Sequence, residues 1–409
     1  MAVVRPFRAL RPEPGGAAAV AAVPYDVVTA DEARELVAGA PLSFLRVTRP
    51  EVDLAPDIDP HDSVVYEMAR ANLAMLRGTA PLVIEAQPAI YVYRLGDEGH
   101  EQTGLAGCFS LDEYERDTIK KHERTRPDKE DDRTKHILTV GAQTGVVFLT
   151  YREMPDLDAE IAAVCQEPPL FDFEATDGVC HTIWRATEEQ TTRLVEGFAA
   201  VPALYIADGH HRAASANRAR RTLRVSLGEA DRLADRDSFV AVAFPDRQTR
   251  ILPYNRTLSN LAGATTEHFL ETVSERLSLE PSSTTIPEKG STSMYIGGCW
   301  YRVELGDVCG GGLDQVASLD VSMLQERVLG PVLGVTDIRT DPRVHFVGGV
   351  RGTSELERLV DCGEAAVAFS LAAVTVPELL AIADAGAIMP PKSTWFEPKL
   401  RDGLLTHLI

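Results

Sequence analysis

Apolar and polar residues follow each other along the chain in short blocks that predict helices and strands in mixed order. Apolar residues recur at helical spacing over residues 64–77, 187–198 and 267–277. Between these helices lie apolar runs of strand length, at residues 41–47, 89–94, 104–109, 146–151, 179–185, 203–207 and 239–244. Strands interspersed with helices in this way predict a mixed α/β, or α+β, fold.

A stretch rich in Pro, Ser and Thr at residues 281–293 predicts a loop between two lobes. Residues 1–280 are interpreted as a core domain with insertions. Residues 281–409 are interpreted as a C-terminal α/β lobe, which begins with a hairpin near 294–305 and ends in a docked tail. We find no internal repeat in either part.

Composition and charge disfavour some classes of binding partner. The 409 residues are 44% apolar, which is enough to fill the cores of two or three domains. Asp and Glu outnumber Lys and Arg by 61 to 41, and a formal charge of -20 disfavours nucleic acid and anionic membranes as partners. Because of this negative charge, an anion site must be local. The six cysteines are scattered and no apolar run approaches 18 residues, so we expect a cytoplasmic protein.

The sharpest candidate for chemistry is the run YIADGHHRA, where an apolar strand passes through a polar turn into a predicted helix. Gly209 permits a tight turn and close approach of a ligand, and amide groups at a helix start can bind phosphate. His210, His211 and Arg212 add side-chain donors, while Asp208 can hold a metal or orient a histidine. A plainer alternative remains open, in which Asp208 caps the helix and the histidines lie at the surface.

A second candidate is the charged segment LDEYERDTIKKHERTRPDKEDDRTKH, at residues 111–136. Glu123 lies there among Lys121, His122 and Arg133, and it is a candidate general base or metal ligand beside cations that suit phosphate. Pro127 marks the start of a further helix. The alternative is an exposed loop laced with salt bridges.

The tail offers a third candidate. Prolines stiffen the run MPPKSTWFEPKL, so that Lys392, Ser393, Thr394 and Trp395 are expected in a fixed loop, where they are candidates for binding a substrate. The alternative is that this tail only docks on a core.

Taken together, these motifs resemble a bacterial and archaeal family known as domain of unknown function 1015. The runs that carry the resemblance are residues 6–12, 24–28, 122–123, 208–212, 254–256, 346–349 and 389–400. The strand, Asp-Gly-His-His-Arg and helix are also similar to the phosphate-binding turn of the ParB/sulfiredoxin-like fold, and most of all to free-serine kinases built on it. Those kinases carry a His-Glu pair that His122 and Glu123 match in type and order.

The resemblance implies a ParB/sulfiredoxin-like nucleotide-binding core with large additional α/β elaborations. It implies a kinase that moves phosphate from ATP or ADP, with Mg²⁺, to the hydroxyl of free serine or a similar amino or hydroxy acid. The catalytic residues would be Glu123 and His211, with Asp208 as the metal ligand. The phosphate-binding residues would be Asp208, Gly209, His210, Arg212, Lys121, His122 and Arg133.

Two other functions stay open from the sequence. One is a phosphatase or hydrolase of a phosphorylated metabolite such as phosphoserine, and the other is a nucleotide-binding regulator without turnover. All three functions imply a small-molecule ligand, and the sequence leaves a homodimer open.

Overall fold

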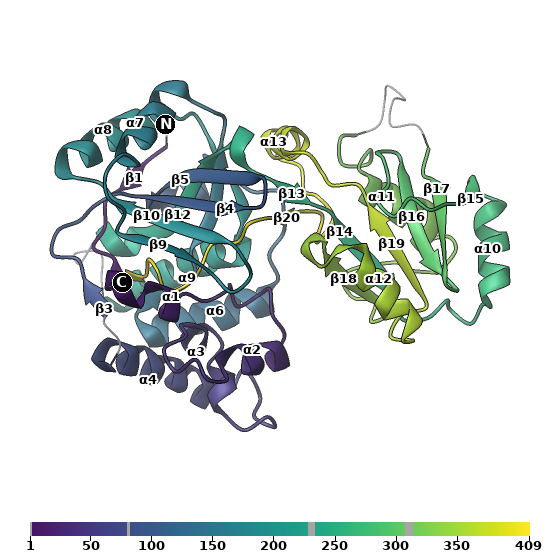
Figure 1. Cartoon of the computed structure of the whole chain (residues 1–409), viewed down its shortest axis with the longest axis horizontal. Helices are drawn as coiled ribbons and strands as arrows, with labels where there is room; N and C mark the ends of the chain where they lie inside the picture. Colours follow the sequence, from purple (N-terminus) through teal and green to yellow (C-terminus); the bar gives the residue numbers. More distant parts are fainter. Residues whose placement is uncertain (1, 80–81, 228–233, 307–313) are drawn as a thin grey trace. The chain divides into compact units, whose positions relative to one another are not determined.

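The computed structural model describes residues 2–79, 82–227, 234–306 and 314–409, and contacts divide the chain into two compact units (Figure 1). The first unit comprises Met1–Lys121, Thr125–Thr249 and Pro398–Ile409. The second comprises His122–Arg124 and Arg250–Glu397. The division therefore falls at 249/250, whereas the sequence places it at 280/281. The difference has a simple cause, since the loop after residue 281 joins two strands of one sheet.

The first unit is built on a nine-stranded mixed sheet, with strand order β6-β11-β8-β12-β5-β4-β10-β9 and β1 paired to β5. Two pairs, β6 with β11 and β8 with β12, are parallel. The central strand β12 is buried along its whole length. The strands are β1 (Val4–Arg5), β4 (Tyr91–Asp97), β5 (His100–Ser110), β6 (Ile119–Lys120), β8 (Val147–Tyr151), β9 (Phe171–Glu174), β10 (Cys180–Arg185), β11 (Leu204–Asp208) and β12 (Ser238–Pro245).

Helices pack around this sheet, and several begin where the sequence predicts. Thr187 and Gln190 form a capping box at the start of one helix, and Pro127 opens another. The helices of the unit are α1 (Ala17–Val20), α2 (Ala30–Val37), α3 (Leu45–Thr48), α4 (Ser63–Thr79), α5 (Leu111–Glu115), α6 (Pro127–Val140), α7 (Pro155–Val164), α8 (Glu188–Phe198) and α9 (His210–Leu227). α6 and α9 lie side by side (Figure 1) and are joined by the ion pair of Arg218 with Glu130.

One strand prediction was wrong. Residues 41–47 form a turn followed by α3, and not a strand. Phe44, Leu45 and Val47 are buried in a satellite core with Val37 and Leu73 of α2 and α4. A short apolar run fits a buried helix as well as a strand, and packing against two helices decides for the helix here.

The last twelve residues, 398–409, complete the first unit and are called the C-terminal segment below. Asp402 exchanges two backbone hydrogen bonds with Ala22, and Thr406 exchanges two with Leu10. Strand β21 (His407–Leu408) pairs with β7 (Ala142–Gln143), and β2 (Leu10–Pro12) pairs with β3 (Leu82–Ile84). Residues from the end of the sequence are thus part of the core of the first unit.

The second unit is an antiparallel sheet of six strands, in the order β15-β17-β16-β19-β14-β18, with helices packed on it. Tyr295, Trp300, Leu356 and Ala368 form part of its core. Its elements are β13 (Ile251–Leu252), β14 (Tyr254–Leu258), α10 (Thr266–Ser274), β15 (Leu279–Pro281), β16 (Ser291–Ile296), β17 (Cys299–Glu304), α11 (Asp320–Leu324), β18 (Val344–Gly348), α12 (Gly352–Asp361), β19 (Val367–Leu371), α13 (Val376–Asp384) and β20 (Trp395–Phe396).

The predicted fold class, mixed α/β, is confirmed by these two units. Among the described residues, none of the helices has the length and apolar character needed to span a bilayer.

Candidate functional site

A parallel strand pair brings the two candidate motifs to one edge of the large sheet. β6 runs parallel to β11, and Tyr205 lies opposite Lys120. Positions 123 and 208 each follow that pair by three residues. Because neighbouring parallel strands end at the same edge of a sheet, the chain leaves β6 toward Glu123 where β11 reaches Asp208. This register was not predicted, since β6 is only two residues long.

The turn after β11 requires glycine. Gly209 has φ of +94°, a left-handed conformation that side chains rarely adopt. A Cβ atom at this position would lie 3.4 Å from the Cα of Val147 and 3.4 Å from the side chain of Arg212. α9 begins at the next residue, and the amide of Ala213 donates to the carbonyl of Gly209. The predicted succession of strand, glycine turn and helix is therefore present.

His211 ties the turn to the segment that carries Glu123. The backbone N–H of Arg126 donates to Nε2 of His211 over 3.0 Å. An accepting Nε2 means that a neutral ring carries its proton on Nδ1. Arg126 lies three positions after Glu123, and an extended chain of that length spans about 11 Å at most. The backbone that follows Glu123 is therefore anchored at the turn.

Arg212 lies inside the first unit, where it supports the turn. Its Nη1 donates to the carbonyl of Val146 at 2.7 Å and its Nη2 to Oδ1 of Asp26 at 2.8 Å, and the residue is 7% exposed. Burial opposes its charge, but Asp26, Asp208 and Asp402 outweigh burial and raise the pKa of Arg212. Arg212 is thus a permanent cation, and a bound phosphate would compete with Asp26 for it.

Asp208 forms an ion pair with a residue that the sequence analysis missed. Oδ2 of Asp208 lies 3.0 Å from Nζ of Lys399, and the two side chains are 24% and 11% exposed. Lys399 lies in the C-terminal segment, beyond the four tail residues proposed to bind substrate. The sequence signal that could have identified Lys399 is its positive charge between Pro398 and Leu400, in a tail that the sequence predicts to dock on a core.

A small, partly open cavity of about 30 Å³ lies beside Arg212. The guanidinium groups of Arg133 and Arg212 lie 4.4 Å and 5.8 Å from the ring centre of Tyr25. Burial, assisted by Asp26, raises the pKa of Tyr25 to about 12, and burial lowers that of His136 to about 4. The cavity has room for a water molecule but not for a nucleotide.

Two predicted phosphate-binding cations are engaged elsewhere in the first unit. Arg133 donates to the carbonyl of Thr48 at 3.2 Å and pairs with Asp132 at 2.8 Å. Lys121 donates to the carbonyl of Tyr114 at 2.6 Å and also pairs with Asp117. Both cations therefore bind other groups of the protein in this structure.

The predicted substrate residues lie in the second unit, in the stretch from the end of α13 to the first residue of β20, Trp395. Lys392 has φ of +56°, and its ammonium group lies 5.5 Å from the ring centre of Tyr254. Hydrogen bonds within the run hold the loop, from Ser393 to the carbonyl of Pro390 and from Trp395 to Glu397. Strain at a non-glycine residue in such a loop is typical of functional segments.

Two further contacts hold this loop within the second unit, and one of them involves the residue before Glu123. The backbone N–H of Met389 donates to the carbonyl of His122 at 2.8 Å. Arg256 is completely buried, and its Nη2 donates to the carbonyl of Pro391 at 3.1 Å. Burial lowers the pKa of Arg256 to about 9, while the charges of Tyr254 and Glu123 act in the opposite direction. Sequence reasoning gave Arg256 no role.

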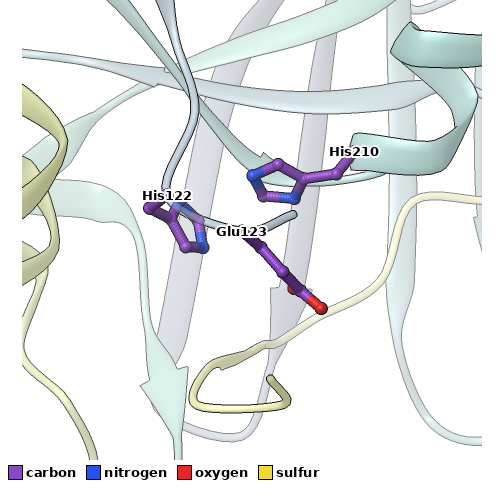
Figure 2. A group of neighbouring side chains, drawn as sticks. All are labelled: His122, Glu123 and His210. Atoms are coloured by element: carbon purple, nitrogen blue, oxygen red, sulfur yellow. The ribbon is translucent and has the colours of Figure 1, made fainter. Parts of the chain in front are cut away.

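One set of side chains could coordinate a metal ion. Ligand atoms of His122, Glu123 and His210 all lie within 4.8 Å of one another, and Figure 2 shows His210 at the start of α9. Two imidazoles and a carboxylate suit zinc, manganese or iron better than magnesium, which prefers oxygen ligands. Magnesium usually binds through one or two carboxylates together with substrate phosphates, and Glu123 is the carboxylate of this set.

The family model described as protein of unknown function (DUF1015) matches residues 4–322, which is most of the chain. The chain belongs to this family. The resemblance drawn from the motifs is confirmed at that level, and the description of DUF1015 supplies no reaction. No curated protein matches this DUF1015 chain.

Several solved structures show a distant likeness to the DUF1015 chain. A conserved hypothetical protein from Pyrococcus furiosus is 14% identical, with 73% of this chain and 94% of that chain covered and a TM-score of 0.37. A free serine kinase in complex with AMP is 12% identical, with 73% and 91% covered and a TM-score of 0.38. SbnI from Staphylococcus aureus is 12% identical, with 74% and 87% covered and a TM-score of 0.39. At such low scores these likenesses assign no role to any residue.

Proposed function

We propose that this DUF1015 protein is a small-molecule kinase that transfers a phosphoryl group from ATP or ADP to the hydroxyl of free serine or of a similar amino or hydroxy acid. The observation that supports this most is the parallel register of β6 and β11, which directs Glu123 and the turn at Asp208 to one edge of the sheet. The hydrogen bond from Arg126 to His211 anchors the intervening loop to the same turn.

In this proposal the nucleotide phosphates bind at the start of α9. Gly209 lets the backbone approach them, and the helix start provides amide donors and a partial positive charge. His210 and His211 add side-chain donors, the latter through Nδ1, because its Nε2 accepts from Arg126. Arg212 keeps the turn in shape through Asp26 and Val146. Mg²⁺, held by Asp208, would neutralise charge on the transferred group.

The acceptor hydroxyl is deprotonated by Glu123. The proton passes to the Glu123 carboxylate as the hydroxyl oxygen forms a bond to the terminal phosphorus of the nucleotide. The bond from that phosphorus to its bridging oxygen breaks, and the nucleotide leaves with the electron pair, as ADP from ATP or as AMP from ADP. General base catalysis of this kind contributes about 10²–10⁴-fold to the rate.

The loop with Lys392, Ser393, Thr394 and Trp395 is proposed to bind the acceptor. The contact of Met389 with His122 supports this, because it holds the loop next to the residue that precedes Glu123. Lys392 is exposed and carries the positive charge that the carboxylate of an amino acid requires.

An incubation with phosphoserine separates the kinase from a hydrolase. The protein is mixed with phosphoserine and Mg²⁺, without nucleotide, with ADP or with AMP, and the products are followed by phosphorus NMR. The kinase forms serine together with ATP from ADP, or with ADP from AMP, and only when the nucleotide is present. Release of inorganic phosphate without any nucleotide contradicts the kinase and favours the hydrolase.

A further inference from the structure

We infer that Lys399 is a phosphate-binding residue of this site. Without a ligand its ammonium group pairs with Asp208, and when a phosphate binds, the ammonium group moves from Asp208 to the phosphate. This inference rests on the proposed function, because it adds a residue of the C-terminal segment to the proposed phosphate-binding turn. Its starting point is the ion pair of 3.0 Å between Nζ of Lys399 and Oδ2 of Asp208.

Lys399 is carried by a firmly held piece of backbone. Leu400 is buried, and Arg401 pairs with Asp177 and contacts His181 at 3.2 Å. The two hydrogen bonds between Asp402 and Ala22 follow directly. The C-terminal segment therefore delivers the ammonium group to the turn with little backbone freedom, which lowers the entropy cost of binding an anion.

The two cations at the turn differ in how readily they can change partners. Arg212 is 7% exposed and donates both to Asp26 and to the carbonyl of Val146, so a phosphate would have to break two hydrogen bonds of a buried guanidinium group. The ammonium of Lys399 is a point charge on a flexible stem, and its partner Asp208 is 24% exposed. Lys399 is therefore the cation that a phosphate can take over at lower cost.

The exchange has a consequence for cation binding. While Lys399 holds Asp208, a divalent cation must displace an ammonium group to reach that carboxylate. A phosphate that attracts Lys399 releases the carboxylate for the cation. Nucleotide and divalent cation are therefore expected to strengthen each other's binding, and the cation alone is expected to bind weakly.

The test compares Lys399→Met with Lys399→Arg and with a matched control, Lys289→Met. Lys289 also pairs with a carboxylate, that of Glu378, but it belongs to the second unit. The probes are ADP with Mg²⁺ and inorganic tripolyphosphate, both measured by calorimetry, and Mn²⁺ alone, measured by electron paramagnetic resonance. Thermal unfolding confirms that each variant is folded.

Lys399→Met is expected to weaken binding of both phosphate ligands at least tenfold and to strengthen binding of Mn²⁺ alone several-fold. Lys399→Arg restores most of the phosphate affinity, and Lys289→Met changes neither. Unchanged phosphate affinity in a folded Lys399→Met variant overturns the inference, whatever happens to Mn²⁺. If the wild type binds tripolyphosphate through Lys399 but does not bind ADP, the nucleotide proposal fails while the inference stands.

Discussion

The ammonium group of Lys399 lies 3.0 Å from a carboxylate oxygen of Asp208, although 191 positions separate the two residues in the sequence. The turn that we propose to bind phosphate is therefore completed by the C-terminal segment. Folding of the first unit and assembly of its site depend on the last residues of the chain.

A chain that ends at Glu397 is expected to lose the folded first unit. The missing segment contains three fully buried leucines, at 400, 404 and 405. At about 1.5–3 kcal/mol each they contribute roughly 5–9 kcal/mol, which is comparable to the whole stability of a typical domain. Limited proteolysis should cleave the shortened chain rapidly between residues 1 and 249. Protease resistance of that region equal to that of the full chain would contradict this account.

Gly209→Ala is expected to lower stability and to abolish binding of ADP. Gly178→Ala is the matched control, since Gly178 has φ of +81° and a Cβ there meets nothing within 4 Å. Both substitutions place alanine in the left-handed region and should cost about 1–2 kcal/mol. Only Gly209→Ala also brings the added methyl group into contact with Val147 and Arg212 at the turn.

Chemical denaturation and calorimetry with ADP distinguish the two glycine variants. A loss of ADP affinity restricted to Gly209→Ala supports the phosphate-binding turn. Equal ADP affinity in both variants would indicate that the glycine serves only the fold.

Asp402 predicts a pH dependence of stability. Burial raises its pKa from 3.8 to about 7, although Arg212 acts in the opposite direction. The folded state therefore keeps a proton that the unfolded state loses, so this contribution to stability is complete below pH 4 and is lost as the pH rises to about 7. Asp402→Asn mimics the protonated side chain and removes the dependence.

Asp402→Asn should therefore become more stable relative to the wild type as the pH rises from 4 to 8, by up to about 4 kcal/mol. Urea unfolding of both proteins at several pH values measures the difference. A constant difference across this range would mean that the buried carboxyl does not titrate there.

Much of the fold was predictable from local pattern. The capping box at Thr187 and the proline at 127 mark helix starts that the structure contains, because both act through neighbouring residues. Residues 41–47 were not predictable, since burial against α2 and α4 decided their conformation. The boundary between the units differs from the predicted one because the loop after residue 281 joins two strands of one sheet, and this pairing is not visible in the sequence.

The candidate site, like the fold, was predictable only where neighbouring residues carry the signal. The glycine turn and the helix after it were predicted, because a strand, a glycine and a helix are signalled locally. The pairing of Lys399 with Asp208 and of Asp26 with Arg212 depends on residues 191 and 186 positions apart, for which the sequence carries no local signal. The inward placement of Arg212 follows from that second pair.

The most direct test of the central claim is transfer of labelled phosphate from ATP to free serine by the wild type and by Glu123→Gln. The wild type should form labelled phosphoserine in the presence of Mg²⁺. The variant should remain folded and bind ADP normally, with a turnover number lower by about 10²–10⁴-fold. Full turnover in a folded Glu123→Gln variant, or no transfer to any hydroxy acid by the wild type, would contradict the account.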